Sequence, residues 1–259
     1  MSDDPGSSAA SGPLARPLEG RIALITGASR GIGYHAARAF GAAGAHVIAL
    51  ARTTGGLEEL DDEIITLGGS ATLVPLDLSD YDGIDRLGGA IHERWGKLDV
   101  FFANAGILGS LSPLGHVPPK EWDQVIAINV TANWRLIRSL DPLLRASEAG
   151  RVIVMSSGAA HNCRPFWGPY SVSKAAVVAL ARTYAGEVEK TPIRVVLVNP
   201  GPMRTAMRAK AMPGEDPESL PHPVELTPHL IEMASPNFDK TGVLFDFPAK
   251  RFLDFQAPG

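Results

Sequence analysis

The sequence predicts an α/β fold, a single doubly wound domain whose parallel sheet is covered by helices on both faces. From about residue 18 onward, short apolar runs rich in Val, Ile and Leu alternate with longer amphipathic stretches. Strands and helices in strict alternation build parallel sheets with right-handed crossovers. The first apolar run also passes directly into a glycine-rich turn. Such folds bind ligands at the carboxyl ends of their strands, so this turn is the first candidate site.

The expected strands are continuous apolar runs that do not alternate with polar residues, so we expect both faces of each strand to be buried. They lie at 22–26, 47–50, 72–76, 100–103, 152–155 and 195–198. The amphipathic stretches predict helices at about 31–43, 57–67, 80–95, 119–145 and 168–189, with a less regular one past 203. Pro118 and Pro119 favour a helix start, and Gly68, Gly69 and Gly96 favour helix ends.

The composition excludes several classes of function. The 259 residues are 45% hydrophobic and 20% charged with a net charge of -4, as in an ordinary globular protein. Nucleic acid is not an expected partner, because a phosphate-binding surface needs an excess of Lys and Arg. A membrane is not expected either, since no apolar run approaches the roughly 20 residues that span a bilayer. The N-terminus lacks the basic and apolar regions of a secretory signal, and the one cysteine, Cys163, fits a reducing compartment. These features predict a cytoplasmic protein.

The domain organisation is expected to be simple. Residues 1–17 are rich in Ser, Gly, Pro and Ala, and they bury too little apolar area to offset the entropy of ordering. We therefore expect them to form a disordered extension, and residues 18–259 to form one domain. The seven histidines are scattered without the spacing of metal ligands, so no catalytic metal is expected.

The glycine-rich turn T-G-A-S-R-G-I-G lies between the first expected strand and the first expected helix. Glycine lets the backbone turn sharply and approach a pyrophosphate closely, while the free N–H groups of the helix start face its negative charge. The turn therefore predicts a dinucleotide site, although its spacing departs from G-x-G-x-x-G and a plain tight turn is the alternative for the motif taken alone. The expected cofactor contacts in the turn are Gly27, Ser29, Arg30, Gly31, Ile32 and Gly33.

Arg52 stands at the end of the second expected strand, where dinucleotide-binding folds place an Asp or Glu that holds the ribose 2'-hydroxyl. No carboxylate there repels a 2'-phosphate, and the planar guanidinium of Arg52 can bind one. Arg30 offers a second cation to the same phosphate. The sequence thus predicts NADP(H) in preference to NAD(H), the alternative being that both arginines are solvated surface residues.

Two more turns fit a bound dinucleotide. Asp77 and Leu78 follow the third expected strand, where a side chain can cap the edge of an adenine. Asn104, Ala105 and Gly106 follow the fourth expected strand, and small residues let the backbone lie flat against a ribose. Local turn formation is the alternative for both segments, because Asn, Asp and Gly are the common turn formers.

Tyr170 and Lys174 are four residues apart in an expected helix, so they project from one face. A phenol with a pKa of ~10 is a poor acid or base at neutral pH unless its anion is stabilised. An ammonium about 4 Å away is worth ~4 kcal/mol at an effective dielectric near 20, or roughly 3 pKa units. We therefore expect Lys174 to lower the pKa of Tyr170. Ser157, at the end of the fifth strand, is expected to donate to a substrate carbonyl oxygen.

These motifs together resemble the short-chain dehydrogenase/reductase family, over about residues 18–247. The resemblance implies a Rossmann-like domain with a seven-stranded parallel sheet, binding NADP(H) and a small-molecule carbonyl or alcohol as substrate. It implies that Ser157 orients the carbonyl, Tyr170 exchanges the proton, Lys174 binds the nicotinamide ribose and Asn129 holds a water of the proton relay. The implied nicotinamide contacts are Pro200, Gly201, Met203 and Thr205, together with Tyr170 and Lys174. The family also implies a homodimer or homotetramer.

Other interpretations stay open at this point. A sensor that binds NADP(H) without turnover has the same fold, and so does a scaffold subunit that packs through its long helices. Substrate choice is assigned to 159–167 and to 206–223, the second of which we expect to be a flexible lid. For the aromatic and sulfur residues of 159–167, packing of the loop against the sheet is favoured over a pocket lining.

Overall fold

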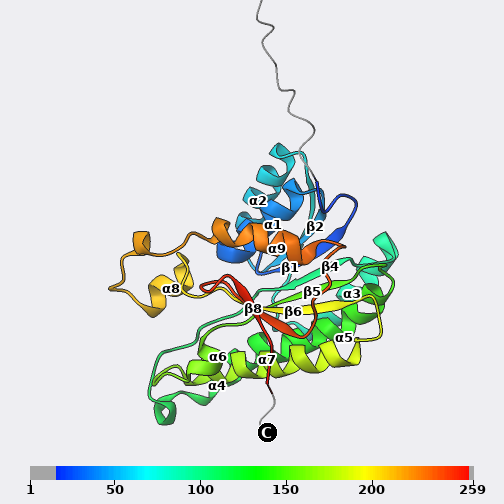
Figure 1. The fold of residues 1–259 in the computed structure, drawn as a ribbon. Helices are drawn as coiled ribbons and strands as arrows, with labels where there is room; N and C mark the ends of the chain where they lie inside the picture. The colour runs from blue at the N-terminus through cyan, green and yellow to red at the C-terminus, as the bar shows by residue number, and fades with distance from the viewer. Residues whose placement is uncertain (1–15, 257–259) are drawn as a thin grey trace, which may run out of the picture.

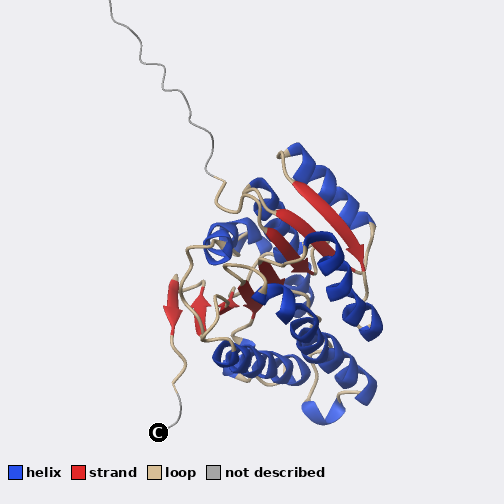
Figure 2. Cartoon of the chain, turned by 90° about the vertical axis from the view of Figure 1, so that its right-hand side faces the viewer, coloured by secondary structure: helices blue, strands red, loops and turns tan. Residues whose placement is uncertain are grey.

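The computed structural model describes residues 16–256. Within that range one sheet of eight strands has the order β3-β2-β1-β4-β5-β6-β7-β8, and helices cover both of its faces (Figures 1 and 2). The strands before the C-terminal pair are β1 (Ile22–Thr26), β2 (His46–Ala51), β3 (Ser70–Pro75), β4 (Val100–Ala103), β5 (Arg151–Met155) and β6 (Arg194–Asn199). The order reverses between β1 and β4, and this switch point is where doubly wound sheets bind ligands.

Two helix layers enclose the sheet (Figure 1). One layer consists of α1 (Gly31–Ala42), α2 (Gly55–Thr66) and α9 (Thr227–Ala234), and the other of α3 (Tyr81–Trp95), α5 (Ala132–Arg145) and α7 (Gly168–Glu187). Strand β1 shows why both layers are needed. Ala23 and Ile25 belong to the core under the first layer, and Leu24 to the core under the second, because successive side chains of a strand point to opposite faces.

The sheet differs from the expected seven-stranded parallel one at its C-terminal edge. Strand β7 (Val243–Asp246) pairs parallel with β6, but β8 (Arg251–Leu253) then returns antiparallel to β7 and forms an eighth strand. A three-residue strand carries too little periodicity to be recognised from the sequence.

The opposite edge also departs from expectation. The third strand runs over Ser70–Pro75 instead of 72–76, and its side chains are half-buried or exposed. It lies at the edge of the sheet, so it is not buried on both faces as predicted. The apolar run alone did not distinguish an edge strand from a central one.

The helix expected over 119–145 is interrupted. It consists of α4 (Pro119–Ile126), a π-helical segment η2 (Ala127–Thr131) and α5. Pro119 does occupy the first turn, as predicted. The wider turn lies at Asn129, and π-helical turns inside α-helices occur frequently at functional sites.

Shorter elements complete the chain. Helix α6 (Ala159–Asn162) precedes α7, and α8 (Ala206–Ala211) lies in a segment that projects from the body of the molecule (Figure 1). Single 3-10 turns are η1 (Leu114–His116), η3 (Pro217–Ser219) and η4 (Pro223–Leu226). Leu18, where the fold was expected to begin, is fully buried. Of the extension expected over 1–17, residues 1–15 lie outside the described range.

Candidate active site

The carboxyl ends of β1, β4, β5 and β6 bring the predicted motifs to one edge of the sheet. The glycine turn follows β1, the Asn104 segment follows β4, Ser157 follows β5, and the Pro200 segment follows β6. Tyr170 and Lys174 reach the same edge from α7, and Asn129 from η2. Parallel strands place their carboxyl ends together, so segments that are far apart in the sequence meet at this edge.

The glycine turn, residues 26–33, leaves a space beside its backbone that larger side chains would fill, and we call this turn the cradle. Gly27 and Gly31 have φ values of +68° and +59°, in the left-handed region that favours glycine. A Cβ on Gly33 would collide with the carbonyl oxygen of Gly27 and lie 2.5 Å from Nδ2 of Asn104. The start of α1 therefore lies directly against the turn, with the N–H groups of its first residues available to an anion.

Thr26 and Asn104 hold the cradle to the loop after β4. The backbone N–H groups of Asn104 and Ala105 each donate to Oγ1 of Thr26 at 3.0 Å, and Nδ2 of Asn104 donates to the Thr26 carbonyl at 3.0 Å. Thr26 is fully buried. The side chain of Asn104 is therefore committed to positioning the glycine turn, and its predicted cofactor contact is left to the backbone of this segment.

Arg52 and Asp77 form the far end of the cradle. Nη1 of Arg52 lies 3.9 Å from Oδ2 of Asp77, and the Arg52 side chain is 67% exposed. Asp77 also accepts hydrogen bonds from the backbone N–H and hydroxyl of Ser79, and these bonds hold the pKa of Asp77 below its ordinary value, with Arg52 a smaller cause. An exposed pair at this distance contributes little stability, so Arg52 can exchange its partner at low cost. Arg30 is also exposed, at the start of α1.

Ser157, Tyr170 and Lys174 form the second part of the candidate site, next to the glycine turn. Tyr170 and Lys174, both on α7, are buried, 8% and 5% exposed. Nζ of Lys174 donates to the carbonyl of Met155 at 2.7 Å and lies 5.8 Å from the centre of the Tyr170 ring. Tyr170 and Lys174 are one turn apart on α7, so both side chains project from the same face of the helix, as predicted.

The acidity of these groups differs from the prediction. Burial raises the pKa of Tyr170, and a hydrogen bond with Ser157 only partly opposes that effect. Burial also lowers the pKa of Lys174 to about 8. In the protein without cofactor, the lowering of the tyrosine pKa expected from Lys174 is not seen, because burial is the largest cause for both groups.

Asn129 is 1% exposed, and its side chain is committed to neighbouring residues. Its Oδ1 accepts from the N–H of Ile107 at 2.8 Å, while Nδ2 donates to the carbonyl of Ile107 at 2.9 Å and to Oγ of Ser173 at 3.0 Å. Ser173 in turn donates to the carbonyl of Tyr170 at 2.8 Å. Asn129 therefore links the loop after β4 to the helix that carries Tyr170.

Comparison with known proteins agrees with this arrangement. The family model described as short chain dehydrogenase matches residues 21–216. The chain belongs to the short-chain dehydrogenase family. The uncharacterized oxidoreductase YciK of Escherichia coli K12 is 36% identical over 233 residues, which cover 88% of this chain and 92% of YciK.

Further relatives differ in cofactor. A short chain dehydrogenase from Shigella flexneri 2a, solved as a complex with NADP, has a TM-score of 0.87 and 36% identity, and the match covers 90% of this chain and 99% of that one. An uncharacterized NAD-dependent oxidoreductase of Mycobacterium tuberculosis H37Rv is 33% identical over 204 residues, 73% of this chain and 74% of the relative. Family membership therefore leaves the choice between NADP and NAD to individual residues.

The loop between Ser157 and Tyr170 in this short-chain dehydrogenase does not pack against the sheet as favoured from the sequence. His161, Cys163 and Phe166 are exposed, Phe166 by 57%. Only Trp167 is drawn inward, with its ring centre 6.0 Å from that of Tyr170 in an edge-to-face arrangement. The N–H of Ser112 donates to the carbonyl of Phe166 at 3.0 Å, so this loop is held to the loop after β4 instead.

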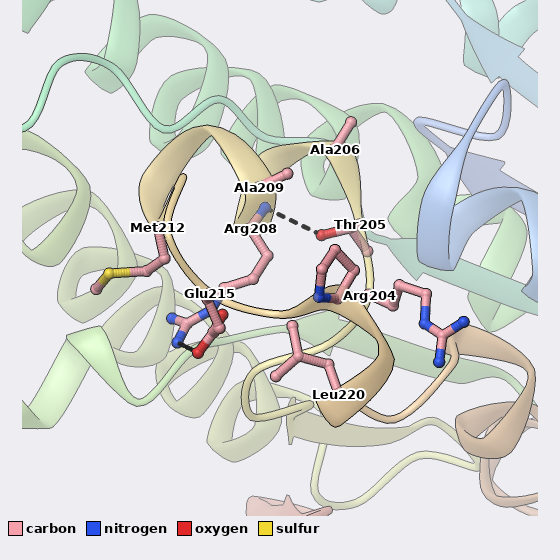
Figure 3. Close-up of a pocket in the computed structure, with 9 residues that line it drawn as sticks. Arg204, Thr205, Ala206, Arg208, Ala209, Met212, Glu215 and Leu220 are labelled. Atoms are coloured by element: carbon pink, nitrogen blue, oxygen red, sulfur yellow. Dashed lines mark hydrogen bonds and ion pairs between the residues drawn. The ribbon is translucent and has the colours of Figure 1, made fainter.

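The segment after Pro200 lies against the cradle. Met203 is 2% exposed, and a Cβ on Gly31 would be 3.6 Å from Cγ2 of Thr205. Beyond Thr205 the expected lid is a folded unit with its own contacts. Arg208 binds Glu215 through two hydrogen bonds of 2.5 and 2.6 Å, and Figure 3 shows this ion pair beside a pocket of about 260 Å³ lined by residues between Arg204 and Leu220.

Several residues that organise the site were not singled out from the sequence. Ile107, Ser173 and Asn133 bind Asn129 through side-chain or backbone hydrogen bonds. The sequence gives a weak indication of two of them. Ser173 lies three residues after Tyr170 and Asn133 lies four after Asn129, so each shares a helical face with a residue that was singled out. The sequence gives no indication of Ile107, because its contribution comes from its backbone.

Two features are absent from residues 16–256. No group of three or more His, Cys, Asp or Glu side chains in that range is arranged to hold a metal ion. No helix there has the length and apolar character needed to cross a membrane.

Proposed function

We propose that this short-chain dehydrogenase transfers a hydride between NADP(H) and a carbonyl or secondary alcohol, with Tyr170 as general acid and base. The observation that supports it most is the meeting of Ser157, Tyr170 and Lys174 at the sheet edge that also carries the glycine cradle. When bound, NADP(H) supplies the hydride in reduction and accepts it in oxidation.

Ser157, Tyr170 and Lys174 handle the proton and the negative charge that accompany hydride transfer. In reduction, the hydroxyl of Tyr170 donates its proton to the carbonyl oxygen of the substrate, on which negative charge develops. The hydroxyl of Ser157 donates a hydrogen bond to the same oxygen and so stabilises that charge. Lys174 lies 5.8 Å from the ring of Tyr170, and in its charged form it favours the tyrosinate that remains. In oxidation the same groups act in reverse.

The residues of the cradle fit a dinucleotide. Gly27, Gly31 and Gly33 leave the space that a Cβ would fill, and the start of α1 offers its N–H groups to the pyrophosphate. We assign cofactor contacts also to Ser29, Arg30, Ile32, Asp77, Leu78, Asn104, Ala105 and Gly106, and at the nicotinamide end to Tyr170, Lys174, Pro200, Gly201, Met203 and Thr205.

A preference for NADP(H) is proposed from Arg52. Its guanidinium is exposed at the end of β2 and is only loosely paired with Asp77, 3.9 Å away. A 2'-phosphate would be a stronger partner, because it offers several charged oxygens to the planar guanidinium. The Shigella flexneri relative binds NADP, which agrees with this proposal.

We also propose that residues 18–259 form the catalytic domain, and that the protein acts in the cytoplasm as a homodimer or homotetramer. Trp134 on α5 and Val172 on α7 are 46% and 44% exposed, and exposed apolar side chains on long helices suit contacts between copies.

The test is a reduction assay that follows NADPH absorbance with a panel of ketones, quinones and ketoacyl thioesters. The wild type should consume NADPH with at least one class, and Tyr170→Phe should lose at least about 100-fold in kcat, as expected for removal of a general acid, while NADPH binding measured by fluorescence is retained. Binding without turnover on every member of the panel would instead favour an NADP(H) sensor.

A further inference from the structure

The loop between Ser157 and Tyr170 has a strained backbone. Within residues 16–256, three residues other than glycine have a positive φ, and two of them lie in this loop, Cys163 at +45° and Phe166 at +74°. A left-handed backbone is an outlier for a side chain as bulky as that of phenylalanine. Such strain clusters at functional sites, where the surrounding structure holds it in place. The strain at Phe166 therefore indicates a function for this residue close to the candidate acid.

The aromatic ring of Phe166 contributes little to the fold. The residue is 57% exposed, so most of its ring is not packed against other side chains. Glycine or asparagine adopts a positive φ with less strain. The peptide group of Phe166 does contribute, because its carbonyl accepts a hydrogen bond of 3.0 Å from the N–H of Ser112, but every residue type has such a carbonyl. The fold thus gives no reason for a phenylalanine at this position.

A second exposed apolar side chain lies against the start of α7. Leu114 is 63% exposed, and a Cβ on Gly168 would be 2.5 Å from its Cδ1. Gly168 begins α7 two residues before Tyr170, so the missing side chain at Gly168 leaves the space that Leu114 occupies. The ring centre of Trp167 lies 6.0 Å from that of Tyr170. Apolar side chains from two loops, among them Phe166 beside Trp167, therefore surround the end of the helix that carries the candidate acid.

The loop that carries Leu114 is held in place on both sides. The backbone N–H and the hydroxyl of Ser110 both donate to the carboxylate of Glu121 on α4, the hydroxyl at 2.9 Å. The bond from Ser112 to the carbonyl of Phe166 joins this loop to the one before α7. The exposed apolar side chains thus lie on backbone that is already fixed. Apolar side chains exposed together beside a site favour the binding of an apolar group.

We propose that Phe166 and Leu114 form an apolar subsite beside Tyr170, and that the substrate is a ketone or secondary alcohol with an apolar chain or ring. This inference rests on the proposed function, because it names the substrate class of the same site. Binding of such a substrate buries apolar surface that is exposed in the free protein, and this burial is favourable. The phenylalanine that the fold does not require is thus explained by substrate binding.

A pair of variants separates the apolar side chain of Phe166 from its backbone. Leucine and asparagine are similar in size, but leucine is apolar, whereas asparagine adopts a positive φ far more readily. Phe166→Asn should therefore be at least as stable as Phe166→Leu in urea unfolding, yet bind an apolar substrate less well. A role in folding alone predicts that stability and binding fall together. Ile65→Asn is the control, because Ile65 is an equally exposed apolar residue, 59%, in the other helix layer on α2.

The first measurement compares methyl ethyl ketone with methyl hexyl ketone as substrates of the intact enzyme with NADPH. The wild type should prefer the longer ketone by about tenfold or more in kcat/KM, because the added chain is buried against the subsite. Phe166→Asn should lower this preference by roughly tenfold, the effect of losing one aromatic contact. Phe166→Leu and Ile65→Asn should keep most of it.

Three results of this assay would overturn the proposal. The first is a wild type without a preference for the longer ketone, and the second is an equal preference in Phe166→Leu and Phe166→Asn. The third uses a methyl ketone of the same length as methyl hexyl ketone whose chain ends in a carboxylate. If the wild type turned this compound over better than methyl hexyl ketone, the subsite would bind an anion and not an apolar group.

The second measurement needs no turnover, so it separates this inference from the proposed function. Binding of para-fluoroacetophenone is followed by fluorine NMR in the presence of NADP⁺, which cannot reduce the ketone. Phe166→Asn should bind this probe roughly tenfold more weakly than Phe166→Leu does. Equal binding by these two variants, or no binding by the wild type, would overturn the subsite even if the enzyme reduces ketones. A wild type that binds the probe through Phe166 but reduces no ketone would refute only the proposed function.

Discussion

Nζ of Lys174 donates a hydrogen bond of 2.7 Å to the carbonyl oxygen of Met155, the last residue of β5. The bond ties the middle of α7 to the strand that leads into Ser157, and so it fixes the relative positions of the candidate acid and its neighbours. Because Lys174 is buried, its pKa is lowered to about 8. The charged amine is therefore held in place at a cost in stability.

That cost predicts how Lys174→Met changes with pH. The unfolded chain holds this proton up to the ordinary lysine pKa of 10.5, whereas the folded protein releases it near 8. Folding stability of the wild type therefore rises with pH between these two values, and below about 8 the charged lysine costs roughly 3 kcal/mol. Lys174→Met should be more stable relative to the wild type at pH 7 than at pH 9.5, measured by urea unfolding. A difference that is the same at both pH values would contradict the burial argument.

Arg52→Asp should reverse the cofactor preference. The change replaces the cation at the end of β2 with a carboxylate that repels a 2'-phosphate and can bind a ribose hydroxyl. We expect NADPH to bind about 10- to 100-fold more weakly, the loss of a charge-assisted hydrogen bond, while NADH affinity changes little. Titration calorimetry with both cofactors measures this. Arg16→Asp, at an exposed site that binds Glu19 and Gly68 far from the cradle, is the control for a general charge effect.

Gly33→Ala should damage the cradle. A methyl group there meets the carbonyl of Gly27 and Nδ2 of Asn104, so either the turn or the start of α1 must move, at a cost of about 1–3 kcal/mol. Both the free energy of unfolding and NADPH affinity should fall. Gly89→Ala is the matched control, because Gly89 lies inside α3 with nothing within 4 Å of the added methyl. It should stabilise the protein by about 0.5–1 kcal/mol and leave affinity unchanged. Normal NADPH binding by Gly33→Ala would show that the turn does not hold the cofactor.

The ion pair of Arg208 and Glu215 should control how well the lid is ordered. Glu215→Gln removes the charge that receives both hydrogen bonds of the guanidinium, and α8, with six residues, is too short to be stable by itself. Limited digestion with trypsin should cut after Lys210 several-fold faster in this variant. Glu218→Gln, which weakens the more exposed pair with Arg204, should have a smaller effect. Equal cleavage of wild type and Glu215→Gln would mean that other contacts order the lid.

The comparison of expectation with structure is clearest in the helix expected over 119–145. Its start at Pro119 was predicted, because a proline in the first turn is a local preference. The π-helical segment at Asn129 was not, since it depends on bonds that Asn129 makes with Ile107 and Ser173, 22 and 44 residues away. The edge position of β3 and the pairing of β8 were likewise beyond local signals, because they depend on which strands become neighbours.

The sequence by itself determined the family, the alternation of strands and helices, and the residues that gather at the sheet edge, since periodicity and motif spacing are local properties of a chain. Tertiary structure decided the acidity of Tyr170 and Lys174, because burial depends on what packs around them and is the largest cause of both pKa shifts. It also decided that Asn104 and Asn129 use their side chains to hold loops together, because their partners Thr26 and Ile107 are far away in the sequence and only the folded chain brings them into contact.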